Sequence, residues 1–197
     1  MERAGEAQLE RRIAEHLDAG DLRRAAEDSI RRYGPEVSAY LRAVLREDAA
    51  ADEVFSRVCE KFWRGLPSFR QESSLRTWLY RLAWNATRDF QKEAARNPTR
   101  PLRTTEISRI AAEITASRPR FERSSFADAV ARLRENLGPR EQSLLTLRIH
   151  VGLSWKEISD IVGSSPTALR KRFERLKAQL RHSAEAAGLL DRRPGSE

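Results

Sequence analysis

Apolar residues recur along most of this chain at intervals of three and four, the spacing that places them on one face of an α-helix. Three such stripes follow one another near the N-terminus: Leu9, Ile13 and Leu17; Leu22, Ala26 and Ile30; and Val37, Tyr40, Leu41, Val44 and Leu45. Gly20 separates the first two stripes, and Pro35, a residue common at the first position of a helix, is expected to begin the third helix. No segment shows the period of two that is typical of strands, so the pattern predicts an all-α protein.

Two further helices are expected before residue 97. The first spans Asp52–Trp63 and ends ahead of a glycine and a proline. The second begins after a cap at Ser73 or Ser74 and extends from Leu75 towards Ala95. Its inner face is expected to contain Trp78, Leu79, Leu82, Ala83, Ala86 and Phe90.

The composition changes between residues 97 and 125, where Pro, Thr, Ser and Arg dominate and the apolar pattern is weak. We expect a flexible linker there, with a short helix inside it. Periodicity returns at Phe126 and, after a restart at Gly138–Pro139, continues in a helix up to Gly152. That helix would contain Leu144, Leu145, Leu147 and Ile149.

The predicted organisation is two small helical domains joined by a flexible linker. Residues 1–25 form a helical N-terminal extension, residues 26–96 the first domain and residues 97–125 the linker. Residues 126–187 form the second domain, and residues 188–197 a flexible tail.

The charge of the chain predicts attraction to a polyanion, because the formal net charge is +8 and the isoelectric point is about 10.3. The single cysteine, Cys59, excludes an intramolecular disulfide, and no Cys/His cluster has metal-ligand spacing. The three histidines are scattered, with no acid–base or nucleophile constellation. We therefore expect no enzymatic activity, no cofactor and no metal. No apolar run is long enough to cross a bilayer, so we expect no membrane insertion and a cytoplasmic protein.

A helix-turn-helix is predicted near the C-terminus. Ser154 and Glu157 have the spacing of a capping box, which starts a short helix. Gly163 can take the left-handed conformation that ends this helix, and Ser165–Pro166 supplies the cap and first residue of the next. The second helix buries Leu169, Phe173, Leu176 and Leu180 and turns outward Thr167, Arg170, Lys171, Glu174 and Arg175.

The outward face of that second helix is suited to the major groove of duplex DNA. Arg170 and Lys171 can reach guanine edges or phosphates, and Glu174 can accept a hydrogen bond from cytosine. The alternative is that these charges only solvate an ordinary helical hairpin. Because caps, turn glycine and basic face coincide, we favour DNA recognition.

A second candidate surface lies in residues 69–96, where aromatic residues alternate with arginines. This mixture suits unstacked single-stranded bases, since rings stack on bases and cations follow the backbone. Trp78 and Tyr80 lie about 200° apart on a helix, so the aromatic residues cannot share one face. We expect Trp78 in the core, and Tyr80 and Trp84 to support a base-binding surface beside Asn85. For any single ring considered alone, core packing is the favoured interpretation.

Two segments of the chain, which contain these two candidate surfaces, resemble a known family. The chain contains the string SSLRTWLYRLAWNATRDF, which resembles the conserved region two of extracytoplasmic-function (ECF) sigma factors, the small promoter-specificity subunits of bacterial RNA polymerase. It also contains LGPREQSLLTLRIHVGLSWKEISDIVGSSPTALRKRFERLKAQL, which resembles their region four. The resemblance covers about Ala26–Arg96 and Phe126–His182, in the same order as in the family. ECF sigma factors are part of the sigma-70 family.

The resemblance implies three sites and a set of partners. Promoter DNA would be read at the −35 element by Thr167, Arg170, Lys171, Glu174 and Arg175. The opened −10 element would be bound by Phe69, Arg70, Ser73, Ser74, Arg76, Tyr80, Trp84, Asn85 and Arg88. Core RNA polymerase would be bound through its largest-subunit clamp by Asp52, Glu53, Ser56, Arg57 and Glu60, and region four would touch the flap of the second-largest subunit. An anti-sigma factor is a further implied partner.

The sequence departs from the family pattern at two places. Ser56 and Arg57 stand where relatives usually have a glutamine and an acidic residue, which affects the expected contacts with the clamp. Thr167–Ala168 replaces the usual Gly-Thr of the recognition helix. The DNA sequence recognised at the −35 element therefore cannot be inferred from relatives. The extension before Gly20 lies outside the usual family core and is either a packing helix, which we favour, or a regulatory contact.

Two other classes of protein remain as alternatives. A helix-turn-helix regulator would bind duplex DNA without incorporation into polymerase, and its aromatic segment would be a sensory or dimerisation core. An adaptor built of two helical bundles would bind neither DNA nor polymerase.

Overall fold

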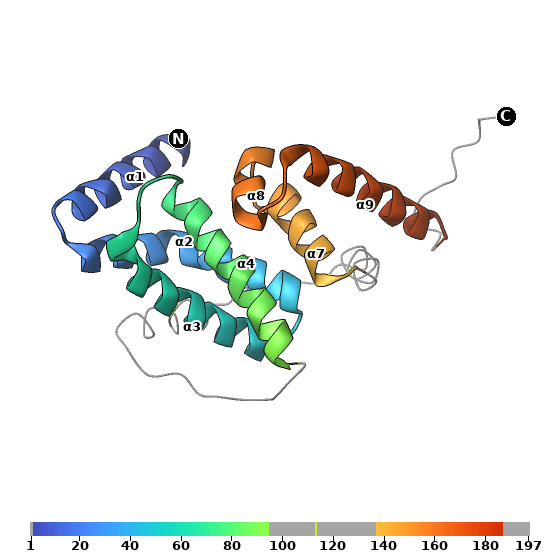
Figure 1. The fold of residues 1–197 in the computed structure, drawn as a ribbon, viewed down its shortest axis with the longest axis horizontal. Coiled ribbons are helices and arrows are strands. Elements are labelled where there is room, and N and C mark those ends of the chain that lie inside the picture. The colour runs from blue at the N-terminus through green and yellow to red at the C-terminus, as the bar shows by residue number, and fades with distance from the viewer. Residues whose placement is uncertain (1, 95–112, 114–136, 187–197) are drawn as a thin grey trace. The chain divides into compact units, whose positions relative to one another are not determined.

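The computed structural model describes residues 2–94, 113 and 137–186, and all regular elements in these residues are helical (Figure 1). The chain divides into two compact units, Met1–Arg118 and Pro119–Glu197, and the division falls within the predicted linker. The all-α prediction is confirmed. The predicted linker helix, the stripe that begins at Phe126 and the C-terminal tail lie outside the described residues, apart from Glu113.

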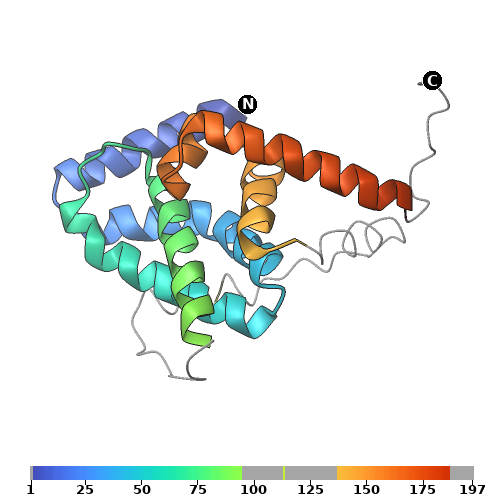
Figure 2. The ribbon, with the colours of Figure 1, turned by 45° about the vertical axis from the view of Figure 1, so that its right-hand side comes forward.

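Four helices and a short 3-10 turn make up the described part of the first unit. The helices are α1 (Glu2–Asp18), α2 (Leu22–Leu45), α3 (Asp48–Gly65) and α4 (Leu75–Ala94), and the turn is η1 (Leu66–Ser68). α4 packs against both α2 and α3, and these two also pack on each other, as Figures 1 and 2 show from two directions. Their shared core contains fully buried aromatic side chains: Tyr33, Tyr40, Phe55, Phe62 and Tyr80. Each such side chain stabilises the fold by roughly 1.5 to 3 kcal/mol relative to an exposed position.

α2 continues through Pro35, so the prediction that a new helix begins there is wrong. Pro35 lies on the exposed side of α2, while Tyr33 and Val37 are buried. The ring removes the hydrogen bond to the carbonyl of Arg31, which is also exposed, so that water can replace the missing N–H. An interior proline costs about 3 kcal/mol, an amount that burial on both sides of the ring offsets.

Most of the predicted N-terminal extension is the helix α1, which packs on α2, and its last residues belong to α2 itself. Ile13 is completely buried, the Tyr33 hydroxyl donates to Glu10 Oε1 at 2.6 Å, and Arg12 pairs with Asp28 at 2.9 Å. The segment between α3 and α4 runs beside α1 in both views (Figures 1 and 2). α1 is therefore an integral packing helix of the first unit.

The second unit contains α7 (Pro139–Leu145), a π-helical turn η2 (Thr146–His150), α8 (Trp155–Val162) and α9 (Pro166–Ala186). Its core is formed by Leu144, Leu145, Leu147, Leu153, Ile158, Leu169, Phe173 and Leu176. The helix expected up to Gly152 continues beyond Leu145 as a π-helical turn to His150, in which the N–H of Val151 donates to the carbonyl of Thr146 at 3.0 Å. This wider turn leaves Ile149 exposed at 56%.

Candidate nucleic-acid interface

The loop between η1 and α4 is held by a stack of aromatic rings. Phe69 stacks on Trp78 with ring centroids 4.9 Å apart, and Trp78 also contacts Phe62 at 4.9 Å. Gly65 makes room for this arrangement, since a Cβ there would lie 3.0 Å from the Trp78 ring. Gln71 has a φ of 56°, so the loop turns sharply after Phe69. The rings thus fix where the loop leaves α3.

Ser74 begins α4. Its Oγ accepts a hydrogen bond from the N–H of Thr77 at 3.1 Å, as a helix cap does. This resolves the predicted choice between Ser73 and Ser74 in favour of Ser74. The six residues expected on the inner face of α4 are all buried or half-buried.

Tyr80 and Trp84 do not form an exposed surface, so that prediction is wrong. Tyr80 is 0% exposed and meets Tyr40 of α2 edge to face at 5.6 Å, and Trp84 is only 5% exposed. Because α2 and α3 cover α4 from different directions, rings that point to different faces of α4 each find a partner. Burial, and then the charge of Glu36, raise the pKa of Tyr80.

The surface that α4 does expose is polar. Asn85 is exposed next to the buried Trp84, as expected, and Arg88 is half-buried one turn further on. In the loop, Arg70 is exposed and Phe69 and Ser73 are half-buried. These side chains offer an amide, cations and one ring edge on the same stretch of chain.

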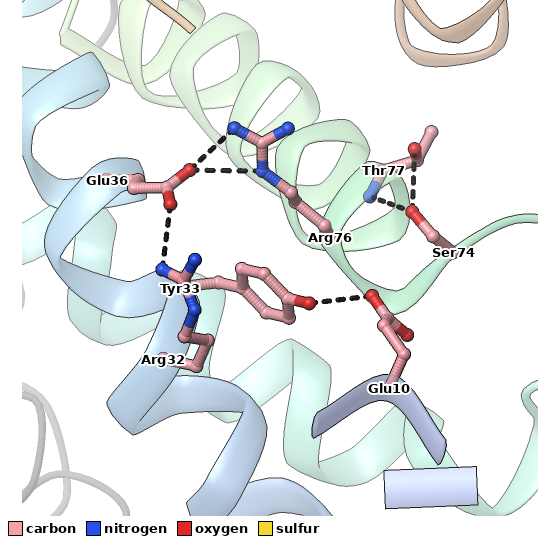
Figure 3. A network of polar contacts seen from close by, with 7 residues as sticks. All are labelled: Glu10, Arg32, Tyr33, Glu36, Ser74, Arg76 and Thr77. Carbon is pink, nitrogen blue, oxygen red and sulfur yellow. Dashed lines mark hydrogen bonds and ion pairs between the residues drawn. The ribbon is translucent and has the colours of Figure 1, made fainter. Parts of the chain in front are cut away.

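Arg76 is fixed by the carboxylate of Glu36, which no sequence pattern indicates as a site residue. Its Nε and Nη2 donate to Glu36 Oε2 at 3.0 and 2.8 Å, while Glu36 Oε1 accepts from Arg32 at 3.1 Å (Figure 3). The guanidinium also lies 5.8 Å from the centre of the Tyr80 ring. The i, i+4 spacing could have indicated the pair of Arg32 and Glu36. No local pattern links Glu36 to Arg76, which lies 40 positions away along the chain.

The second unit contains the predicted helix-turn-helix. Ser154 and Glu157 form a reciprocal capping box, with N–H to oxygen distances of 2.7 and 3.2 Å, and Gly163 ends α8 at a φ of 73°. The hydroxyl of Ser165 accepts from the N–H of Ala168 at 3.3 Å and begins α9. Leu169, Phe173 and Leu176 are buried, which confirms the predicted inner face, and Leu180 is half-buried.

The five polar residues expected on the outer face of α9 are exposed: Thr167, Arg170, Lys171, Glu174 and Arg175. Glu174 pairs with Lys177 at 2.9 Å on the same face. This surface therefore offers hydrogen-bond donors, and acceptors at Thr167 and Glu174, along about two helical turns.

The five residues expected to bind polymerase lie on one side of α3 and are half-buried. Arg57 donates to Glu53 at 2.7 Å and to Glu93 of α4 at 2.6 Å, and its guanidinium lies 5.7 Å from the Phe90 ring centre. The hydrogen bond that Arg57 donates to Glu93 contributes most to the raised pKa of Arg57. The departure from the family pattern at Arg57 is thus matched by partners within the chain.

The remaining polar residues of that side of α3 also have intramolecular contacts. Ser56 Oγ donates to the carbonyl of Asp52 at 3.0 Å, and the Asp52 carboxylate lies 3.8 Å from Arg42. Glu60 pairs with Arg64 at 2.6 Å.

Other chemistry is limited in the part of the chain that the structure describes. Burial raises the pKa of Cys59 to about 12, which leaves its thiol protonated and unreactive. Within residues 2–94, 113 and 137–186 no three His, Cys, Asp or Glu residues are grouped as metal ligands. Among the same residues, no helix combines the length and apolar character needed to span a membrane.

A helical fold that contains a capped helix-turn-helix with a basic outer face is typical of DNA-binding transcription proteins. The sigma-70 region 2 family matches residues 29–97 of this chain. The ECF RNA polymerase sigma factor SigD of Mycobacterium tuberculosis is 31% identical over 178 residues, which cover 86% of this chain and 81% of SigD. The sigma factor YlaC of Bacillus subtilis is 28% identical over 163 residues, which cover 81% of this chain and 91% of YlaC.

A solved structure has the same fold. The sigma factor RpoE of Bartonella quintana, in complex with the anti-sigma factor NepR, aligns with a TM-score of 0.62 at 15% identity over 83% of this chain and 96% of RpoE. Taken with the sequence matches, the chain belongs to the ECF family of RNA polymerase sigma factors. It is an alternative sigma factor, a class of transcription initiation factor, and a free-standing helix-turn-helix regulator is not favoured.

Proposed function

We propose that this sigma factor directs core RNA polymerase to its promoters by reading the −35 element as duplex and the −10 element as an opened strand. The observation that carries the proposal is the division of α9 into a buried apolar face and an exposed polar face. Thr167, Arg170, Lys171, Glu174 and Arg175 are the reading residues. Each bidentate contact with a base edge is worth about 1 to 3 kcal/mol of discrimination.

The −10 strand is bound by the loop and by the polar surface of α4. Phe69, Arg70, Ser73, Ser74, Arg76, Asn85 and Arg88 contact the strand. Tyr80 and Trp84 support this surface from beneath, since their rings are buried. Unstacking a base costs a few kcal/mol, which contacts with the flipped base and with polymerase offset.

Core polymerase binds through the side of α3 that contains Asp52, Glu53, Ser56, Arg57 and Glu60, which contact the clamp of the largest subunit. The second unit contacts the flap of the second-largest subunit. Arg57 is paired with Glu53 and Glu93. The two carboxylates partly neutralise its positive charge, so the charge has less effect on binding to the clamp. An anti-sigma factor is a further partner, and it would compete with polymerase for the chain. None of these roles requires a catalytic residue.

The test is transcription by reconstituted holoenzyme. Core polymerase with and without the purified chain is given a library of genomic fragments, and the 5′ ends of the transcripts identify the promoters. The expected result is synthesis from a small set of promoters that core polymerase alone does not use. A chain that shifts duplex DNA in a gel but gives no new transcripts would instead be a helix-turn-helix regulator, and a chain that does neither would be an adaptor.

Polymerase binding is tested separately. Wild-type chain is expected to be retained on immobilised core polymerase, and a charge reversal at the clamp surface, Glu60→Lys, is expected to lower retention. Failure of the wild type to bind in the absence of any inhibitor would contradict the proposed incorporation into polymerase.

A further inference from the structure

Two ion pairs join α3 to α4, and in both of them α3 supplies the cation and α4 the carboxylate. Arg57 donates to Glu93 at 2.6 Å, and Lys61 lies 3.4 Å from Asp89. The cations are four residues apart on α3 and the carboxylates four residues apart on α4, so the two helices run in opposite directions here (Figure 1). Asp89 and Glu93 are the acidic residues of α4, and each of them has a cation of α3 beside it.

A further pair of cations on α4 has no such partner. Arg88 and Lys92 are also four residues apart, and neither forms a hydrogen bond or an ion pair within the described residues. Lys92 is exposed and Arg88 is half-buried. Like charges at this spacing repel each other and destabilise a helix. The end of α4 therefore holds a repulsive pair of cations that an anion could relieve.

The cations and the carboxylates of α4 point in different directions. At about 100° per residue, Lys92 lies about 20° and Arg88 about 60° from Asn85 in one direction around the helix. Asp89 and Glu93 lie about 40° and 80° from Asn85 in the other direction, towards α3. The two cations therefore continue the polar surface of α4 that contains Asn85, and the carboxylates are turned away from it.

We propose that Arg88 and Lys92 form a phosphate track, which extends the −10 surface to the end of α4 and binds the DNA backbone there. The cations of α3, Arg57 and Lys61, keep this track positive because they neutralise the neighbouring carboxylates. The inference rests on the proposed function, in which Arg88 contacts the opened strand. Contacts with phosphates add affinity and carry no sequence information.

The ion pairs matter because each carboxylate of α4 directly follows a cation of the track. Asp89 follows Arg88, and Glu93 follows Lys92. Without a cation beside it, either carboxylate would repel the phosphate that its neighbour attracts. At a distance of ~10 Å in water, one unit charge changes affinity about twofold, and less at high salt. Arg57 and Lys61 are thus positioning residues, which act on DNA only through the carboxylates.

Lys92→Gln tests the track in holoenzyme that is assembled with an excess of the chain. The probe is a promoter from the transcript library with its −10 region already unpaired. The slope of log affinity against log salt should decrease by about 0.7 to 0.9, the value for one lost phosphate contact, so binding in ~0.1 M salt should fall about fivefold. The loss should be equal on a template with altered −10 bases. An unchanged affinity and slope, or a loss confined to the native −10 bases, would overturn the track.

Arg23→Gln is the matched control. It removes one exposed cation from α2, where Arg23 lies 3.5 Å from Glu27, and it changes the net charge of the chain by the same amount. Its affinity and salt slope should equal those of the wild type. An equal loss in both variants would overturn the track, because the effect would then come from the overall charge.

Three variants test the role of α3. Arg57→Gln should weaken binding of the unpaired promoter about twofold at low salt. Glu93→Gln should strengthen this binding, and the double variant should restore the affinity of the wild type. A loss that persists in the double variant, or weaker binding by Glu93→Gln alone, would overturn the role of α3.

The second ion pair gives an independent version of this test. Lys61 and Asp89 are about half exposed, so their removal perturbs the fold little. Lys61→Gln should weaken binding, and added Asp89→Asn should restore it, even where Arg57→Gln fails to assemble with polymerase. A Lys61→Gln loss that Asp89→Asn does not restore would overturn the role of α3. A holoenzyme that selects promoters and binds them equally well without Lys92 would overturn the track alone, whereas one that selects no promoter would overturn the proposed function and the track with it.

Discussion

α4 and α9 are both long helices with aromatic and basic residues, but the surface of α9 is as its sequence predicts and that of α4 is so only in part. α9 has its buried residues on one face, so its apolar stripe gives its outer face directly. α4 packs against both α2 and α3, and Tyr80 and Trp84 are therefore buried where exposed rings were expected. Periodicity identifies an outer face when the packing partners of a helix lie on one side of it, as α7 and α8 do for α9.

The largest effect is expected for Trp84→Ala. Removal of a ring that is 5% exposed should lower the free energy of unfolding of the first unit by ~3 to 5 kcal/mol. The neighbouring variant Asn85→Ala, at an exposed position, should change that free energy by less than ~0.5 kcal/mol. Urea denaturation followed by circular dichroism measures both.

The contrary result for α4 is also well defined. If Trp84→Ala kept wild-type stability and lost activity even on a promoter with an unpaired −10 region, the ring would belong to the DNA surface. Asn85→Ala is expected to show that loss of activity instead, with its stability intact.

On α9, Arg170→Ala or Lys171→Ala should weaken binding of the −35 duplex by ~1 to 3 kcal/mol if the side chain reads a base edge, without a change in stability. Gel-shift titrations with native and scrambled elements measure this. Arg181→Ala is the matched control, because it removes one exposed charge further along the same helix. Equal losses in all three variants, on both duplexes, would reduce the role of the face to phosphate attraction.

The turn that begins α8 should matter less. Ser154→Ala removes the hydroxyl that accepts from the N–H of Glu157 and should destabilise the second unit by about 1 kcal/mol. Lys156→Ala, at an exposed position of the same helix, should leave the midpoint of thermal unfolding nearly unchanged. A Ser154→Ala protein as stable as wild type would mean that water caps α8 equally well.

The smallest effect is expected at the outer edge between α3 and α4. Lys61 lies 3.4 Å from Asp89, and both side chains are about half exposed. Lys61→Ala should therefore change the free energy of unfolding by no more than ~1 kcal/mol, and less at high salt. A loss comparable with that of Trp84→Ala would show that this edge is far less solvated than its exposure indicates.

The sequence predicts the elements whose signals are local. The capping box at Ser154, the left-handed Gly163 and the stripe from Leu169 to Leu176 all depend on residues within a few positions, and each is confirmed. The continuous helix through Pro35 is not predicted, because burial of Tyr33 and Val37 on both sides of the ring outweighs the local preference of proline for the start of a helix. The environment of Arg76 is not predicted for a different reason: its carboxylate partner, Glu36, comes from another helix, 40 positions away along the chain.

The buried thiol of Cys59 can report how often the first unit opens transiently. Cys59 is the single cysteine of the chain, and burial raises the pKa of its thiol to about 12. A thiol reagent can therefore modify the protein only while α3 is transiently exposed, so the rate of modification counts opening events. The same protection means that an oxidant would reach the Cys59 sulfur only in molecules whose first unit has already opened. In folded molecules this thiol would remain reduced.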